Sequence, residues 1–196
     1  MENPSKVLIN FVGGKIGYLL NSRDDAYVRA SLAKLRRGIG KKPGSLPGIW
    51  EFLFESLPEE FLSRTGEPTH AEWAAHMAIT LFALHQQGKN PHENPMSISN
   101  EPLGSAVRLL RMKRGDSAEQ AIKRRFDAVV TSDSPEELAH HLRGLIQLLR
   151  SEGIPLDYPR LAGDLFQFQK PELRDGVRLR WGQDYYKMRK GEENNA

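Results

Sequence analysis

Apolar residues recur at helical spacing in the segment from Ser134 to Gly153, which holds the clearest pattern in the chain. Leu138, Leu142 and Leu149 mark one side of a helix with 3.6 residues per turn. The opposite side is polar and carries two arginines seven residues apart, which therefore point in nearly the same direction. The pattern predicts an amphipathic helix with one side in a core.

Both ends of this helix are marked by residues that favour helix boundaries. Ser134 is a favoured N-cap residue, Pro135 suits the first helical position, and Glu137 completes a capping box. Gly153 and Pro155 favour the end of a helix. We therefore expect about four and a half turns between these limits.

Helical spacing recurs along most of the chain, and no segment shows a convincing strand pattern. The segment from Thr69 to Gly88 is apolar nearly all round and is expected to be the central helix of the N-terminal half. An aromatic-rich segment from Trp50 to Leu62 is expected in the core. Residues 1–22 show only a loose helical pattern interrupted by glycines. The predicted fold class is all-α, with two small helical bundles sharing one compact unit.

A polar segment from Lys89 to Glu101, rich in Asn, Pro and Ser, separates two groups of predicted helices. It predicts a mobile loop at the end of an N-terminal helical bundle, residues 1–100. A C-terminal helical bundle would then comprise residues 101–196. The 196 residues, 39% of them hydrophobic, suffice to bury a core.

Composition narrows the function classes. The chain has no cysteine, which excludes disulfides, thiolate zinc sites and cysteine nucleophiles and fits a reducing cytoplasm. No apolar run approaches transmembrane length, so we expect a cytoplasmic protein without membrane association. Charge alternates in blocks: the net charge is +5 from Arg23 to Lys42, −6 from Pro43 to Val107, and +5 from Arg108 to Arg125. Such blocks suit a polyanion and a basic neighbour on different surfaces, or are ordinary solvated helix faces.

Motifs for catalysis are missing from the sequence. Adjacent His140 and His141 point about 100 degrees apart on a helix, and no histidines have zinc-ligand spacing. The Gly14-Lys15-Ile16-Gly17 stretch is formally a GxxG clamp, but that loop requires a fold with strands. The glycine-rich loop around Lys41 lacks Walker spacing, and no GxSxG elbow occurs. We therefore expect no metal, no cofactor and no enzymatic activity.

Arginine dominates the basic residues that remain, and its planar fork suits phosphate. The candidate nucleic-acid-binding residues are Arg29, Arg36, Arg37, Lys41, Lys42, Arg108, Arg111, Arg114, Arg124, Arg125, Arg143 and Arg150. Arg108, Arg111 and Arg114 are expected along an outer helix face. Few aromatic residues lie among them, which favours contact with the backbone over stacking on bases. The aromatic residues near the C-terminus, Trp181 and Tyr185 among them, fit helix packing better than base stacking.

Six motifs follow one another from about Ala26 to Tyr186. They read LAKLRRGIGKKPG, TLFALHQQG, PLGSAVRLL, IKRRFDAVVTSD, LAHHLRGLIQLLRSEGIPLDYPRLAGDLFQF and VRLRWGQDYY. Together they resemble the CasB small-subunit family of the type I-E CRISPR surveillance complex, Cascade. The resemblance implies a non-catalytic, all-helical protein, present as two copies in the complex, that binds nucleic acid without sequence preference. It would hold target and displaced strands of the R-loop in antiviral defence.

The resemblance also implies partners and contact residues. The partners would be the backbone subunits that carry the CRISPR RNA, the large PAM-recognising subunit, CRISPR RNA, target DNA and a second copy of the chain. Family contacts would fall on Arg36–Arg37, Lys41–Lys42, Lys123–Arg125 and Arg143. Many relatives have an arginine directly after the glycine of the LG step, where this chain has Ser105, and its arginine is displaced to position 108. Two alternatives stay open: an architectural protein-interaction module, and a helical nuclease or phosphatase that would need a metal.

Overall fold

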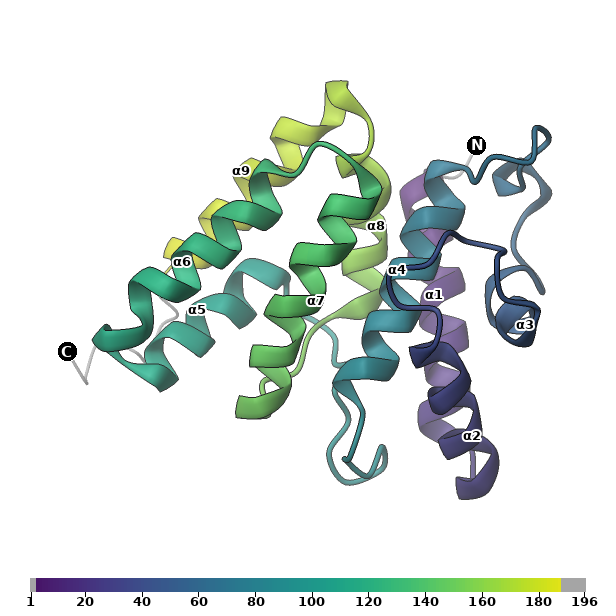
Figure 1. The fold of residues 1–196 in the computed structure, drawn as a ribbon, viewed down its shortest axis with the longest axis horizontal. Helices are drawn as coiled ribbons and strands as arrows, with labels where there is room; N and C mark the ends of the chain where they lie inside the picture. The colour runs from purple at the N-terminus through teal and green to yellow at the C-terminus, as the bar shows by residue number, and fades with distance from the viewer. Residues whose placement is uncertain (1–2, 188–196) are drawn as a thin grey trace.

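The structure is a computed structural model that describes residues 3–187, and within that range the chain is helical with no strand (Figure 1). The α-helices are α1 (Pro4–Asn21), α2 (Asp25–Arg36), α3 (Trp50–Leu53), α4 (His70–His85), α5 (Leu103–Arg114), α6 (Asp116–Thr131), α7 (Pro135–Glu152), α8 (Tyr158–Phe168) and α9 (Pro171–Tyr186). Two short 3-10 helices, Pro47–Ile49 and Glu59–Phe61, flank α3. The all-α fold class predicted from the sequence is confirmed.

Helix α4 is the central helix of the N-terminal half, as its apolar sequence predicts. Every residue from Ala71 to His85 is buried, and α1, α2, α7 and α8 pack around the helix. Its start is fixed by a capping box: the hydroxyl of Thr69 accepts from the Glu72 amide at 3.1 Å, and the Glu72 carboxylate accepts from the Thr69 amide at 2.7 Å. This helix is the scaffold on which the flanking helices are placed.

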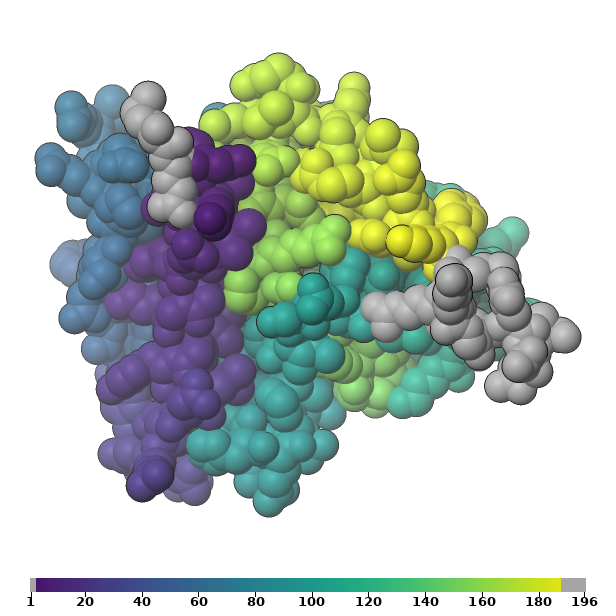
Figure 2. All heavy atoms as spheres, turned by 180° about the vertical axis from the view of Figure 1, so that it is seen from behind, coloured from purple at the N-terminus to yellow at the C-terminus, as the bar shows by residue number. Residues whose placement is uncertain are grey.

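The two halves of the chain share one continuous core. Helix α5 packs against α6, α7 and α9, whereas α8 packs against α1 and α4 as well as α9. Figure 2 shows α1 and α8 side by side on the face opposite to that of Figure 1. The boundary proposed near residue 100 stays a prediction, because α8 joins helices from both sides of it.

Helix α7 has the ends that its sequence predicts. The Ser134 hydroxyl accepts from the Glu137 amide at 3.1 Å, and Gly153 adopts the left-handed conformation with φ of 66°. One detail differs from a full capping box, because the Glu137 carboxylate accepts from the amide of Asp133 instead of Ser134, at 2.9 Å. The hydrogen bond from Glu137 therefore reaches Asp133, which lies one residue before the N-cap of α7.

Helix α1 is continuous through Gly13, Gly14 and Gly17, although the sequence shows only a loose pattern there. The GxxG stretch consequently lies inside a helix and forms no loop. The reason is close packing against α8: a Cβ on Gly163 would lie 2.7 Å from Ile9. Within residues 3–187, no helix combines the length and apolar character needed to cross a bilayer.

The loop after α4 and the short helix α3 refine the sequence expectations. The Gln86 side chain donates to the carbonyls of Lys89 and Asn94, at 3.2 and 3.1 Å, and accepts from the Met96 amide at 2.8 Å. These bonds tether the segment from Lys89 to Glu101, whose mobility stays a prediction. The expected core position of Trp50 is wrong, because the side chain is 47% exposed while its indole N–H donates to a backbone carbonyl. Neighbouring Phe52 and Leu53 take the inward positions of α3 instead.

Candidate nucleic-acid interface

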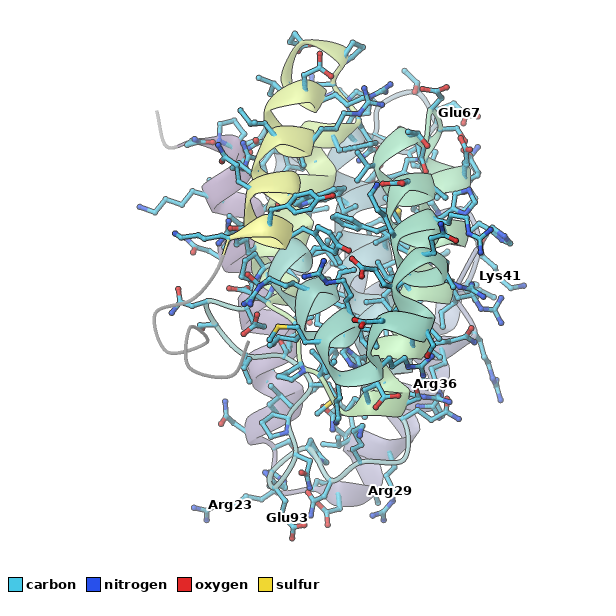
Figure 3. All side chains as sticks on the ribbon, turned by 90° about the vertical axis from the view of Figure 1, so that its left-hand side faces the viewer. Arg23, Arg29, Arg36, Lys41, Glu67 and Glu93 are labelled. Atoms are coloured by element: carbon cyan, nitrogen blue, oxygen red, sulfur yellow. The ribbon has the colours of Figure 1, made fainter. Side chains whose placement is uncertain are left out.

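Basic side chains of α2 lie along one side of the molecule. Arg29 and Arg36 are seven residues apart, so they project from the same side of the helix. Both line a hollow of about 420 Å³ between α2 and residues 86–91, and Lys89 also lines it. In Figure 3, Arg29, Arg36 and Lys41 follow one another along the right-hand side of the molecule. Helix α2 therefore supplies one end of a basic surface.

Helix α7 continues this surface through Arg143 and Arg150, which also lie seven residues apart. The Arg150 guanidinium donates to the Gln87 side-chain oxygen at 2.7 Å, which fixes it beside the end of α4. Burial lowers the pKa of Arg36 from its ordinary value, and the positive charge of nearby Arg150 lowers it further. Arg36 of α2 and Arg150 of α7 thus lie close enough to repel each other, and a bound anion would remove this electrostatic cost.

Lys41 lies in the loop that follows α2, and a buried histidine holds this loop in place. The His76 Nε2 lies 2.8 Å from the Gly38 carbonyl, and burial lowers the pKa of His76 so that the ring stays neutral. A Cβ on Gly38 would lie 2.8 Å from the Ile49 side chain and 3.0 Å from the Thr80 side chain of α4, so a larger residue would force these side chains to move. Lys41 itself is exposed, and the loop packs beside Ala139 of α7.

Helices α6 and α7 complete the surface with a hollow of about 530 Å³ between them, which we call the α6–α7 hollow. Arg124 and Arg125 of α6 and Arg143 of α7 line it. Two small residues, Ala128 and Gly144, also line it from the two helices. The three guanidinium groups therefore converge on one concave region, and Figure 1 shows α6 and α7 side by side there.

Histidines and an amide side chain also line the α6–α7 hollow. His140 and His141 both line it, and their rings meet edge to face with centroids 5.3 Å apart. Gln147 lies one turn further along α7. Within residues 3–187, no group of three or more histidine or carboxylate side chains is arranged to hold a metal ion. The histidines belong to the basic surface, which their sequence spacing alone did not indicate.

These elements together form what we call the basic track. It consists of Arg29, Arg36, Lys41, Arg124, Arg125, Arg143 and Arg150. In the part of the chain that the structure describes, no member of the track forms an ion pair with a carboxylate. Arginines of α8 and α9 behave differently: Arg160 pairs with Asp184 at 3.2 Å, and Arg180 pairs with Asp164 at 2.9 Å. The track arginines thus keep their charge available for an external anion.

The candidate residues of α5 lie outside the track. The expected outer position of Arg108 is wrong, because α6, α7 and α9 cover this helix and leave Arg108 3% exposed. Arg111 pairs with Glu119 at 2.8 Å, and Arg114 pairs with Glu152 at 2.9 Å. These ion pairs connect α5 to α6 and α7, so they hold helices together.

Two candidates near the end of α2 also differ from the track residues. Lys42 pairs with Glu67 at 2.5 Å, although both side chains are largely exposed. Arg37 is exposed at the C-cap of α2 and is turned about 100 degrees from Arg36 around the helix axis. Lys89 and Gln87 were not singled out from the sequence, because their role depends on how the end of α4 meets α2 and α7.

Two of the three aromatic side chains near the C-terminus, Trp181 and Tyr185, pack in the core as expected, whereas the same expectation for Tyr186 is wrong. Trp181 is fully buried, donates to the Asp164 carboxylate at 2.8 Å and stacks on Phe168 at 5.4 Å between centroids. Tyr185 is also buried, whereas Tyr186 is 65% exposed. Packing thus accounts for Trp181 and Tyr185 and leaves Tyr186 at the surface.

Comparisons with known proteins agree with the architecture. The family model for CRISPR-associated protein Cse2 matches residues 31–186. The crystal structure of CasB from Thermobifida fusca has 30% sequence identity and a TM-score of 0.76, covering 92% of this chain and 98% of that chain. No curated protein sequence matches the chain.

More distant structures share the fold. A Cse2-family protein from Thermus thermophilus has 22% identity and a TM-score of 0.63, covering 94% of this chain and 99% of that chain. CasB from M. ruber has 21% identity and a TM-score of 0.65, covering 90% and 92%. The family model, which spans most of the chain, and the similarity to the Thermobifida fusca structure show that this chain belongs to the Cse2 (CasB) family of CRISPR-associated proteins.

Proposed function

We propose that the protein is a non-catalytic small subunit of a type I-E Cascade complex and binds nucleic acid through the basic track. The observation that carries this proposal is the convergence of arginines without carboxylate partners from α2, α6 and α7, while arginines on α8 and α9 are paired. Guanidinium groups without carboxylate partners bind phosphate at little cost, because no internal ion pair has to break. Family membership supports the CRISPR-associated role.

The track suits strands of an R-loop. Its members contact phosphate oxygens by charge and fork geometry, which is independent of sequence. R-loop formation is nearly balanced in base-pairing energy, so a few added phosphate contacts shift it towards the open state. In this proposal the track holds target and displaced strands, and the other Cascade subunits, the CRISPR RNA and a second copy of the chain surround it.

Reversing two charges of the track tests the proposal. The double variant Arg36→Glu/Arg143→Glu should lose most of its affinity for single-stranded DNA. The slope of log affinity against log salt should fall by at least about 1.4, because each lost single-strand contact removes about 0.7. Fluorescence anisotropy across a salt series, at a fixed reference salt, measures both quantities.

A matched control separates the track from net charge. Arg23 and Lys34 are exposed and form no ion pair within residues 3–187. Lys34 lies two residues from Arg36 and so faces away from it, and Figure 3 shows Arg23 apart from Arg36 and Lys41. The variant Arg23→Glu/Lys34→Glu makes the same change in net charge and should keep wild-type binding.

Equal binding by the wild type and both double variants would refute the proposal. Normal assembly into the complex without salt-dependent strand binding would instead support an architectural module. The acidic block from Pro43 to Val107 would then dock a basic neighbour.

A further inference from the structure

The α6–α7 hollow has a feature that helix stability does not explain. Gly144 lies within α7, and its backbone needs no positive φ. A Cβ at this position would meet only Arg125 Nη1, at 3.5 Å, which is an ordinary contact with the end of a flexible side chain. Glycine is the poorest helix former apart from proline, so alanine would suit the helix better. Gly144 therefore keeps a space open that packing does not require.

The groups around this space have unused hydrogen-bonding capacity. Arg124, Arg125, Arg143, His140 and Gln147 form no side-chain hydrogen bond or ion pair in the described residues. Three are guanidinium groups, one is an imidazole and one is a carboxamide, and all are planar. Phosphate binding needs only the cations, whereas a carboxamide pairs with the donor and acceptor edge of a base.

The volume and the lining of the hollow also favour a base. Its volume of about 530 Å³ falls within the range of roughly 300 to 1,000 Å³ typical of small-ligand sites. Unstacked bases bind on imidazole rings and guanidinium planes, both of which line this hollow. A duplex keeps its bases paired and stacked, so only a single strand can place a whole base there.

We propose that the α6–α7 hollow receives one unstacked base of a single-stranded nucleic acid, while Arg124, Arg125 and Arg143 contact its phosphates. The proposal rests on the proposed function, because it adds a base-binding subsite to the basic track. It makes binding depend on the presence of bases without making it specific for a sequence, since stacking tolerates every base. It also makes the track prefer single strands to duplexes.

An oligonucleotide with abasic spacers tests this inference directly. The full chain is titrated with a single-stranded DNA and with the same strand whose central nucleotides carry no base. Wild type should bind the abasic strand roughly 5- to 100-fold more weakly, which corresponds to the usual contribution of one stacked base. The Gly144→Leu variant, which fills the hollow, should bind both strands equally and at the abasic level.

Control variants keep the test independent of folding. Gly182→Leu places the same side chain on α9, where a Cβ would meet nothing within 4 Å, and should keep the wild-type preference. Gly144→Ala is expected to fold at least as well as wild type. It should nevertheless reduce the difference between the two strands, because its methyl group enters the hollow.

The outcomes distinguish the two proposals. If wild type binds both strands equally with a clear salt dependence, the hollow binds only phosphate, and the inference is overturned while the proposed function stands. If Gly144→Ala and Gly144→Leu retain the full preference for the normal strand, the base binds elsewhere and the inference is also overturned. If wild type binds neither strand more tightly than Arg36→Glu/Arg143→Glu does, both proposals fail.

Discussion

His85 is a neutral base enclosed in the core at the end of α4. Its Nδ1 lies 2.9 Å from the Tyr158 hydroxyl oxygen, and this hydroxyl donates its hydrogen to the Leu81 carbonyl at 3.3 Å. Burial, followed by the charge of Lys89 and a smaller effect of Arg150, lowers the pKa of His85 to about 3. The ring therefore stays neutral in the folded protein at pH values where an unfolded chain would protonate it.

This burial predicts that stability falls in mild acid. The unfolded state takes up a proton near pH 6.5 and the folded state only near the lowered pKa. The contribution of His85 is thus complete above pH 6.5 and is lost progressively as pH falls towards about 3. We expect the free energy of unfolding to drop by about 2 kcal/mol between pH 7 and pH 5 from this residue. Urea unfolding at the two pH values measures the change.

The variant His85→Gln provides the comparison. It should be less stable than wild type at pH 7, because it loses the contact with Tyr158. Its stability should change less between pH 7 and pH 5, because the titrating group is gone. If His85→Gln lost as much free energy of unfolding between pH 7 and pH 5 as wild type does, the assignment to His85 would be contradicted.

Helices α5 and α9 approach each other more closely than side chains normally allow. A Cβ on Gly104 would lie 2.2 Å from the Trp181 carbonyl oxygen and 2.9 Å from the Tyr185 amide nitrogen. Both are backbone atoms, so the contact cannot be relieved by a change of rotamer. Glycine at this position sets the distance between the two helices.

Gly104→Ala should therefore destabilise the protein by about 3 kcal/mol or more, at the upper end of the usual cost of overpacking. Thermal unfolding of the variant measures this. Gly144→Ala is the control, because it adds the same methyl group to a helix with only an ordinary contact and should not lower the melting temperature. If Gly104→Ala and Gly144→Ala were equally stable, α9 would be able to move away from α5 at a small cost in free energy, and the prediction would be wrong.

The sequence predicts those elements whose signals are local. Ser134, Pro135 and Gly153 define α7, and Thr69 with Glu72 starts α4, because capping depends on residues a few positions apart. The continuity of α1 is less visible, since packing on α8 overrides its glycines. Helix periodicity thus gives the fold class but no distances between helices.

The candidate nucleic-acid interface likewise has features that the local sequence predicts and features that appear only after folding. The seven-residue spacing of Arg143 and Arg150 places them on one side of α7 from sequence alone. The burial of Arg108 was not predictable, because it depends on three helices that cover α5. The α6–α7 hollow was equally unpredictable, because residues of α6 and of α7 come to line one hollow only after folding.

At the scale of the whole molecule, arginines divide into two groups with different tasks. Within residues 3–187, those of the basic track have no carboxylate partner, whereas Arg174 and Arg178 of α9 hold neighbouring elements together. Arg174 donates to the Phe168 carbonyl at 2.9 Å, Arg178 donates to the Val130 carbonyl at 2.8 Å, and both lie over the Phe168 ring. The arginines that are available to an external anion and those that hold helices together thus lie on different helices.

Two double variants with equal loss of charge test this division. Arg124→Ala/Arg125→Ala should reduce the salt slope of strand binding by about 1.4 and change the free energy of unfolding by less than about 1 kcal/mol. Arg174→Ala/Arg178→Ala should cost about 2 to 4 kcal/mol of stability and leave the salt slope unchanged. Anisotropy and urea unfolding on the same samples provide both readings. An equal reduction of strand binding in both double variants would contradict this division of the arginines.

The packing of α8 against both α1 and α4 has a consequence for the synthesis of the protein. The ribosome produces α1 and α4 well before Phe168, the last residue of α8. At about 5 to 20 residues per second, roughly 4 to 17 seconds pass between the emergence of His85 and that of Phe168. During this interval the sides of α1 and α4 that later contact α8 lack their partner, so we expect the nascent chain to expose an apolar surface to chaperones until α8 arrives.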